Sequence, residues 1–230
     1  MKKLSIIIPV FNEEKTIEKI LKKIESVSLD NIEKEIIIID DNSKDGTAEI
    51  LNKLSDKYKI FFQDKNYGKG AAIRRGFKEA QGDIILIQDA DLEYSPEDYK
   101  KLISPIIKTD AQVVYGSRFS GGQARRVLFF WHYLGNKFLT GFSNMMTNLN
   151  LTDMEVCYKV FSREVIDKIG PKLTSNRFGV EPEITALIAK NKFCIYEVGI
   201  TYNGRTYKEG KKINWKDGIA AIWHIIKFNL

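Results

Sequence analysis

The 230-residue sequence has only two cysteines, Cys157 and Cys194, which lie far apart without metal-ligand spacing. This excludes a disulfide framework and a cysteine-based zinc site, and it predicts two reduced, buried thiols of a cytosolic protein. No apolar run reaches the roughly 18 residues that a membrane-spanning helix needs. The beginning of the chain, Met1-Lys2-Lys3, leads into a strand pattern and not into the apolar region of a signal peptide. We therefore expect a soluble or peripheral protein.

Internal repeats, low-complexity tracts and Pro/Gly/Ser linkers are also missing, which predicts a single domain. Hydrophobic residues make up 43% and charged residues 29% of the chain, so a packed core is expected and wholesale disorder is not. The net charge of +6 favours polyanionic partners such as nucleotides or anionic lipid. No basic run with interleaved aromatic residues and no recognisable nucleic-acid-binding module is present, so we expect no nucleic acid partner.

Apolar periodicity predicts alternating strands and helices in the first half of the chain. The expected strands lie near residues 4–10, 35–39, 60–62, 83–87 and 112–115, and the expected helices near 14–24, 47–54, 70–80 and 96–107. This alternation predicts an α/β fold with a mostly parallel, Rossmann-like sheet covered by helices on both faces. The second half is less regular, with helical spacing at 127–148, 184–189 and 215–228 and extended patterns at 156–161 and 193–202.

The most informative stretch is Gln88-Asp89-Ala90-Asp91, which directly follows the apolar strand pattern of residues 83–87. Two carboxylates separated by one small residue can converge on a hard divalent cation that carries a diphosphate. Acidic pairs on exposed turns are common, so the pair alone proves little. Its position at the carboxyl end of a buried strand, where open α/β sheets bind their ligands, favours a binding site.

Three further loops are expected at the same edge of the sheet. In residues 9–14, Asn12 either caps a turn or contacts a ligand. Asp40 and Asp41 end a second buried strand, where two consecutive acids are costly unless something binds them, although such residues also make turns. The glycines of residues 66–70 open a helix and allow close approach of a phosphate, but the loop is too short for a Walker-type site.

Together these segments resemble the inverting glycosyltransferases of family 2, which have the GT-A fold, and among them the branch similar to dolichol-phosphate-mannose synthase. The resemblance covers most of the chain and is carried by residues 6–13, 39–47, 66–70, 89–91, 116–119 and 152–159. No single stretch is specific, but their combination is. The resemblance implies one GT-A domain over residues 1–230, with a nucleotide-sugar-binding half at 1–119 and an acceptor-binding half at 120–230 that ends in an amphipathic helix.

The resemblance also implies roles for individual residues. Residues that contact the nucleotide sugar would be Pro9, Phe11, Glu13, Asp41, Lys69, Asp89, Ala90 and Asp91. Asp89 and Asp91 would hold Mg²⁺ or Mn²⁺. Asp91, Asp153 and Arg118 would be catalytic, and Arg118, Arg205 and Lys211 would contact the diphosphate or the acceptor phosphate. Two positions depart from the pattern: Glu93 stands where mannose-transferring relatives often have Gln, and His132 lies near a position where many have Arg.

The implied reaction moves a hexose, mannose or glucose, from a GDP- or UDP-linked donor to a polyprenyl or dolichyl phosphate at the cytoplasmic face of the membrane. Such an acceptor is ionised at neutral pH and needs no strong general base, whereas a sugar hydroxyl would require Asp153 as the base. Two alternatives therefore stay open. One is a soluble family 2 enzyme that acts on a glycan hydroxyl in cell-wall or surface polysaccharide synthesis, and the other is a catalytically silent nucleotide-sugar-binding adaptor.

A basic pair, Arg125-Arg126, precedes the apolar and aromatic residues 127–131. This pattern suits an anionic membrane surface, and it is equally compatible with apolar side chains that fill the core. The terminal helix either packs on the domain or lies in the membrane interface. We expect peripheral membrane binding through both segments, or else a membrane partner subunit that presents the lipid.

Overall fold

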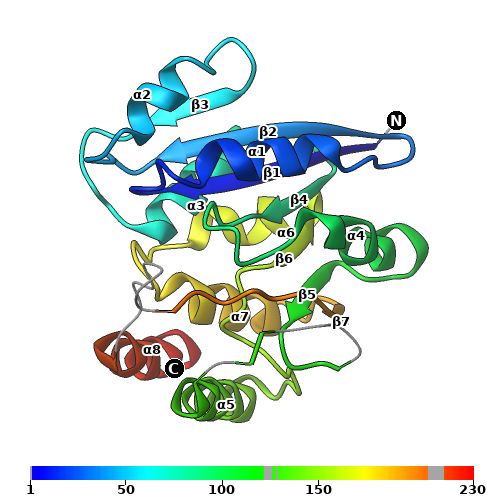
Figure 1. Cartoon of the computed structure of the whole chain (residues 1–230). Helices are drawn as coiled ribbons and strands as arrows, with labels where there is room; N and C mark the ends of the chain where they lie inside the picture. The colour runs from blue at the N-terminus through cyan, green and yellow to red at the C-terminus, as the bar shows by residue number, and fades with distance from the viewer. Residues whose placement is uncertain (1, 122–125, 128, 207–214) are drawn as a thin grey trace.

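The computed structural model describes residues 2–121, 126–127, 129–206 and 215–230, the side chains of 215–217 excepted (Figure 1). Its strands are β1 (Lys2–Val10), β2 (Ile32–Asp40), β3 (Lys59–Phe62), β4 (Ile84–Ile87), β5 (Val113–Ser117), β6 (Lys159–Ser162) and β7 (Ile195–Gly199). They form one sheet in the order β3-β2-β1-β4-β6-β5-β7. The predicted mostly parallel sheet is confirmed, with one addition: β6 runs antiparallel to both of its neighbours.

The centre of the sheet is apolar on both sides. Ile6, Ile7 and Ile8 of β1 are fully buried, and so is the facing run of β2 from Ile37 to Ile39. A strand that is covered on both faces reads as a continuous apolar run instead of an alternation. This is why the β-branched runs predicted the strands correctly.

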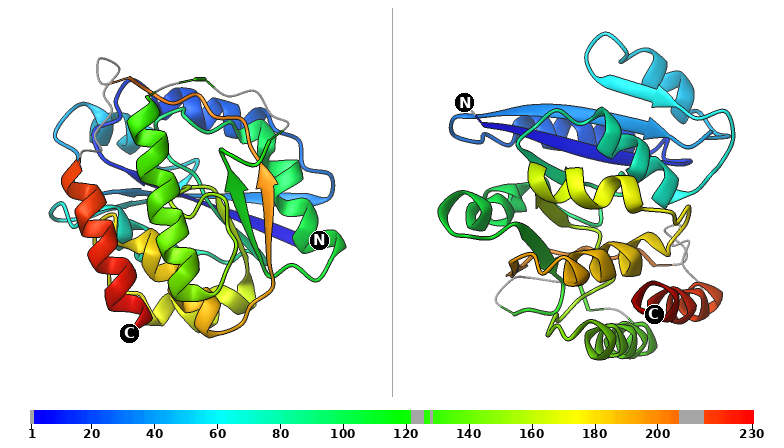
Figure 2. Two further views of the ribbon diagram at one scale, coloured as in Figure 1. Left: turned by 90° about the horizontal axis from the view of Figure 1, so that it is seen from below. Right: turned by 180° about the vertical axis from the view of Figure 1, so that it is seen from behind.

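Helices cover both faces, as the sequence predicts. They are α1 (Ile17–Ser26), α2 (Thr47–Asn52), α3 (Lys69–Glu79), α4 (Tyr99–Lys108), α5 (Phe130–Thr147), α6 (Arg163–Ile169), α7 (Val180–Lys190) and α8 (Trp215–Asn229). Helix α1 lies on one face of the sheet, and α3, α6 and α7 lie on the other (Figure 1; Figure 2, right). The short helix α6 was not predicted, because seven residues carry too little periodicity.

Helices α5 and α8 lie side by side, away from the centre of the sheet (Figure 2, left). The apolar spacing that predicted them marks the outer face in part, because Leu134, Phe138 and Trp223 are exposed. The inner side of α5 instead buries Thr140 and Ser143. No helix among the described residues is long and apolar enough to cross a membrane.

The antiparallel direction of β6 decides which residues meet at the site. Strands β1, β2, β4 and β5 all end at one edge of the sheet, and β6 begins there. The loops after the four parallel strands and the segment before Lys159 are thus brought together. Cys157 in that segment is buried and Cys194 is half-buried, so the prediction of two buried thiols is right for the first and wrong for the second.

Candidate active site

The two carboxylates of the Asp-Ala-Asp stretch lie immediately after β4, and each is paired with a cation. Lys69 at the start of α3 places its Nζ 3.1 Å from Asp89 Oδ1. Arg205 places its Nη2 2.8 Å from Asp91 Oδ2. Ala90 between the two acids is buried, so its side chain packs inward while its neighbours remain partly exposed. The structure therefore brings together two acids and two cations that the sequence places up to 136 positions apart.

Electrostatics favour a cation at this pair. Burial, together with the charges of Asp89 and Glu93, raises the pKa of Asp91 to about 7, and Arg205 opposes this rise. Oxygen ligands that repel one another in a part-buried site suit Mg²⁺ or Mn²⁺. The described residues contain no cluster of three or more metal-ligating side chains. Two carboxylates fit a metal of this class, since such ions usually complete their coordination with substrate phosphates and water.

Glu93 has a contact that the sequence did not reveal. Its carboxylate accepts hydrogen bonds from the backbone N–H of Arg205 at 2.7 Å and from the hydroxyl of Tyr202 at 2.9 Å. The ring of Tyr202 in turn lies under the guanidinium of Arg118, 5.3 Å from its centre. Glu93 therefore anchors the segment that carries Arg205, and Tyr202 links that segment to Arg118.

The residues that the resemblance assigns to the nucleoside include those of the loops after β1 and β2. Glu13 is buried, and its backbone N–H donates to Thr47 Oγ1 at 2.9 Å. Asn12 has a positive φ of 54°, and its side chain accepts from the backbone N–H of Lys44 at 2.7 Å. Asn12 thus connects the two loops. This contact agrees with the alternative in which Asn12 caps a turn. Pro9 and Phe11, which flank this turn, are half-buried.

Asp41 ends β2 and is buried. Its carboxylate accepts hydrogen bonds from Gln63 Nε2 at 2.7 Å and from the backbone N–H groups of Tyr67 and Gly68 at 2.8 and 2.7 Å. Burial raises the pKa of Asp41, and the two backbone hydrogen bonds lower it. One acid therefore shapes the loop that leads to Lys69, in addition to any nucleoside contact.

We expect Asp41→Ala to weaken nucleoside diphosphate binding by about ten- to a hundredfold, because hydrogen bonds to a charged group contribute roughly 1.5–3 kcal/mol each. Calorimetric titration of UDP and GDP measures this effect. The matched control is Asp56→Ala, which removes an exposed acid. Unchanged affinity would show that Asp41 only forms the turn.

Arg118 and Asp153 form a buried, bidentate ion pair. Arg118 Nε and Nη2 donate to the two carboxylate oxygens of Asp153, each at 2.7 Å, and the backbone N–H of Arg118 adds a third bond at 3.0 Å. Asp153 is fully buried. Asn136 on α5 also accepts from Arg118 Nη2 at 3.3 Å. The acceptor-side residues predicted from the sequence therefore lie in direct contact.

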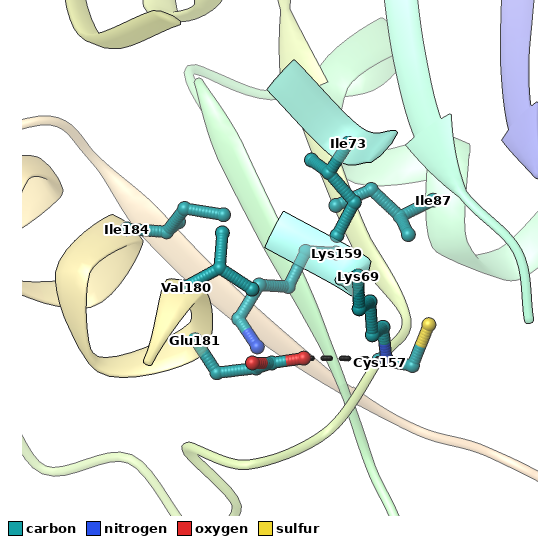
Figure 3. A pocket seen from close by; sticks show the side chains of 8 residues that line it. All are labelled: Lys69, Ile73, Ile87, Cys157, Lys159, Val180, Glu181 and Ile184. Atoms are coloured by element: carbon teal, nitrogen blue, oxygen red, sulfur yellow. Dashed lines mark ion pairs between the residues drawn. The ribbon is translucent and has the colours of Figure 1, made fainter. Parts of the chain in front are cut away.

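Two further acids, Glu181 and Glu155, lie near Lys69 or its crevice partner Lys159, and the sequence analysis did not assign them to the site. Lys69 also pairs with Glu181 of α7 at 3.2 Å, in a crevice that includes Cys157 and Lys159 (Figure 3). Burial and the charge of Glu181 raise the pKa of Glu155 to about 8. Glu155 precedes an antiparallel strand, so a search for acids after parallel strands does not find it. Lys69 is thus paired with Glu181 as well as with Asp89.

Two further positions were named from the sequence. Lys211 lies outside the described residues. His132 lies on α5 with its ring centre 5.3 Å from that of Phe129, and its backbone carbonyl accepts from Asn136. His132 is thus connected through Asn136 to Arg118.

Residues 5–170 match the family model described as glycosyl transferase family 2. The chain belongs to this family. It is 32% identical to a dolichol-phosphate mannosyltransferase of Pyrococcus furiosus over 91% of this chain and 59% of the relative, so it spans about three fifths of that protein. It is 27% identical to a UDP-N-acetylglucosamine–dolichyl-phosphate N-acetylglucosaminyltransferase of Methanococcus voltae over 100% of this chain and 97% of the relative.

A solved structure confirms the GT-A fold of this family 2 glycosyltransferase. Glucosyl-3-phosphoglycerate synthase from Mycobacterium tuberculosis, in complex with Mn²⁺, UDP-glucose and phosphoglyceric acid, superposes with a TM-score of 0.74. The alignment covers 99% of this chain and 80% of that chain at 18% identity. At this identity the likeness establishes the fold alone.

Proposed function

We propose that this family 2 glycosyltransferase moves a hexose, mannose or glucose, from a nucleotide sugar to a polyprenyl phosphate. A phosphate oxygen of the acceptor attacks the anomeric carbon, and the bond to the nucleoside diphosphate breaks with inversion. The observation that carries the proposal is the pairing of Asp153, whose two oxygens both accept hydrogen bonds from Arg118. Asp153 could act as a base only after that pair breaks, and an ionised phosphate needs no base.

The cations of the site support an anionic acceptor. Arg118 and Arg205 are linked through Tyr202 and Glu93, so two guanidinium groups lie on the side where the acceptor must approach the donor. Both relatives described above have dolichyl phosphate or dolichol phosphate in their names. A divalent ion at Asp89 and Asp91, when bound, neutralises the negative charge that develops on the leaving diphosphate. Arg118 and Arg205 would align the two anions.

A screen of UDP- and GDP-sugars tests the proposal. Each donor is combined with a short polyprenyl phosphate or with an oligosaccharide, and both product and released nucleotide are measured. We expect transfer to the lipid phosphate and a loss of about a hundredfold in Arg205→Gln, since charge-assisted bonds to phosphate contribute roughly 1.5–3 kcal/mol. Transfer to the oligosaccharide that depends on Asp153 would favour the glycan-hydroxyl alternative. Nucleotide-sugar binding without transfer to any acceptor would favour the adaptor.

We also propose that the protein docks on the cytoplasmic face of the membrane through the beginning of α5 and the outer face of α8. Phe130 and Trp131 are 64% and 76% exposed, so they do not fill the core. Trp223 of α8 is also exposed, whereas Ala221 and Ile225 pack inward. The 18 residues of α5 include one lysine and no acid, which suits an apolar and anionic surface. Of the basic pair, Arg125 lies outside the described residues and Arg126 donates to the carbonyl of Gly204.

Vesicle co-sedimentation tests this docking surface. Binding should rise with anionic lipid and fall with ionic strength, because basic residues contribute about 1 kcal/mol each near such a surface and salt screens them. The double variant Phe130→Ser/Trp131→Ser should bind at least about tenfold more weakly even at low salt, since burial of an apolar side chain contributes roughly 1.5–3 kcal/mol.

The control for vesicle binding is Phe62→Ser. Phe62 is 45% exposed, and it lies on β3 at the opposite edge of the sheet (Figure 1). Wild-type protein that fails to bind anionic vesicles at low salt would contradict the docking surface. A membrane partner subunit would then have to present the lipid.

A further inference from the structure

Arg205 lies where three carboxylates converge. Its guanidinium is 2.8 Å from Asp91 Oδ2, 3.6 Å from Glu13 Oε2 and 3.6 Å from Glu93 Oε1. These acids come from the loops after β1 and β4, so no short-range sequence pattern explains the cluster. The Arg205 side chain is only 19% exposed. A guanidinium thus supplies the positive charge at a set of oxygen atoms that would otherwise repel one another.

One contact of Arg205 is incomplete. Its Nε atom is buried and has no hydrogen-bond partner among the described residues. A buried donor without a partner costs about 1–3 kcal/mol, so its position is not optimised for these carboxylates alone. The backbone N–H of Arg205, in contrast, is bound to Glu93 at 2.7 Å. The main chain is therefore anchored, whereas Nε has only the 3.6 Å ion-pair contact with Glu93 Oε1 and no hydrogen bond.

A divalent ion bound to Asp91 Oδ2 would compete with Arg205 for the charge of this carboxylate. A metal ion would repel the guanidinium, because both are cations within a part-buried site. Asp89 differs in this respect, since its partner Lys69 is also paired with Glu181 at 3.2 Å. Lys69 would thus keep a partner if a metal took its place at Asp89, whereas the close contact of Arg205 is with Asp91 and its two other ion partners, Glu13 and Glu93, lie at 3.6 Å.

We propose that Arg205 occupies the place of the metal ion in the unloaded enzyme and is displaced from Asp91 when the metal and nucleotide bind. The released Nη2 can then donate to a phosphate of the acceptor. Metal and donor therefore bind before the acceptor. The acceptor step rests on the proposed function, whereas the competition between Arg205 and the metal does not.

Direct measurement of Mn²⁺ binding tests the competition without any turnover. Calorimetry or the electron paramagnetic resonance of free Mn²⁺ gives the affinity of the protein for the metal alone. We expect Arg205→Gln to bind Mn²⁺ on the order of tenfold more tightly than the wild type, because metal binding no longer has to break an ion pair. Mn²⁺ affinity that is unchanged or weaker in Arg205→Gln overturns the proposal.

The matched control is Arg75→Gln, which removes an arginine that is also paired with a carboxylate, Glu79, at 2.8 Å. It changes the net charge equally and lies on the surface of α3, so its Mn²⁺ affinity should equal that of the wild type. If Mn²⁺ bound equally more tightly to both variants, the change in net charge alone would explain the effect, and the proposal would be overturned. Circular dichroism of each variant verifies the fold.

A wild-type measurement keeps the order of binding testable even if Arg205→Gln does not fold. The affinity for farnesyl phosphate is measured with and without Mn²⁺ and nucleoside diphosphate. We expect at least about tenfold tighter binding in their presence. Affinity that does not depend on them contradicts the order. If farnesyl phosphate does not bind under any condition, the polyprenyl-phosphate function is contradicted. Tighter Mn²⁺ binding in Arg205→Gln would still support the competition between Arg205 and the metal.

Discussion

Replacing Asp91 by asparagine or alanine is expected to lower the rate of hexosyl transfer by about a thousandfold, since a metal ion that neutralises the leaving diphosphate contributes several kcal/mol to the transition state. Asp91 lies at the end of β4 and is paired with Arg205 at 2.8 Å. The fold should persist, because Arg205 keeps Glu13 and Glu93 as partners. Initial rates with saturating donor and Mn²⁺ measure the effect.

Asp89→Ala should be milder, because Lys69 is retained by Glu181 and keeps a positive charge beside the diphosphate. The control is Asp56→Asn, which changes an exposed acid outside the site. Treatment of the wild type with EDTA should reproduce the loss, and added Mg²⁺ or Mn²⁺ should reverse it. Wild-type rates in Asp91→Asn, or in the presence of EDTA, would rule out the metal assignment.

The second large effect concerns stability. Asp153→Ala should lower the free energy of unfolding by about 3–5 kcal/mol, because it leaves the guanidinium of Arg118 buried without its counter-ion. The Arg118 side chain is 12% exposed, and Asn136 would remain as a weak partner at 3.3 Å. For a protein of this size the melting temperature should fall by roughly 10 °C. Urea denaturation and thermal melts followed by circular dichroism measure both quantities.

Two further variants serve as controls for the loss of stability in Asp153→Ala. Glu79→Ala breaks the exposed pair with Arg75 and should change stability by only about 0.3–0.5 kcal/mol. The double variant Asp153→Leu/Arg118→Met removes both charges and should recover much of the lost stability, while transfer remains abolished. If Asp153→Ala is as stable as the wild type, the ion pair between Asp153 and Arg118 is not desolvated. Asp153 of the wild-type protein would then be available as a base.

Strand patterns in the sequence predict those parts of the site that follow parallel strands, whereas Asp153, which precedes β6, was named only through the family resemblance. Asp41, Asp89 and Asp91 stand after apolar runs, and chain topology alone brings them to one edge. Glu155 was missed because it stands before β6, whose antiparallel direction no local pattern reveals. The contact between Glu93 and Arg205 spans 112 positions and depends on how β7 and the following segment return to the site. Long-range pairing of this kind is a property of the fold and not of a motif.

The helices also show a feature that local sequence patterns do not reveal. The 3.6-residue period predicted α5 and α8 correctly, but it could not tell which side of each helix is covered. In α5 the larger apolar residues Leu134 and Phe138 are exposed, while Thr140 and Ser143 face inward. Small polar residues fit there because α5 contacts the acceptor-side loop closely, as the hydrogen bond from the backbone N–H of Met154 to Thr140 Oγ1 at 3.2 Å shows.

The three hydrogen bonds of Asp41 have a consequence for changes of donor preference. The same carboxylate receives donors from Tyr67 and Gly68, directly ahead of the helix that carries Lys69. A substitution at Asp41 that adapted the proposed nucleotide site to a different base would therefore also disturb the backbone in front of Lys69, and with it the cation beside Asp89. We therefore expect a change of donor base to require transplanting the β2 loop together with the beginning of α3.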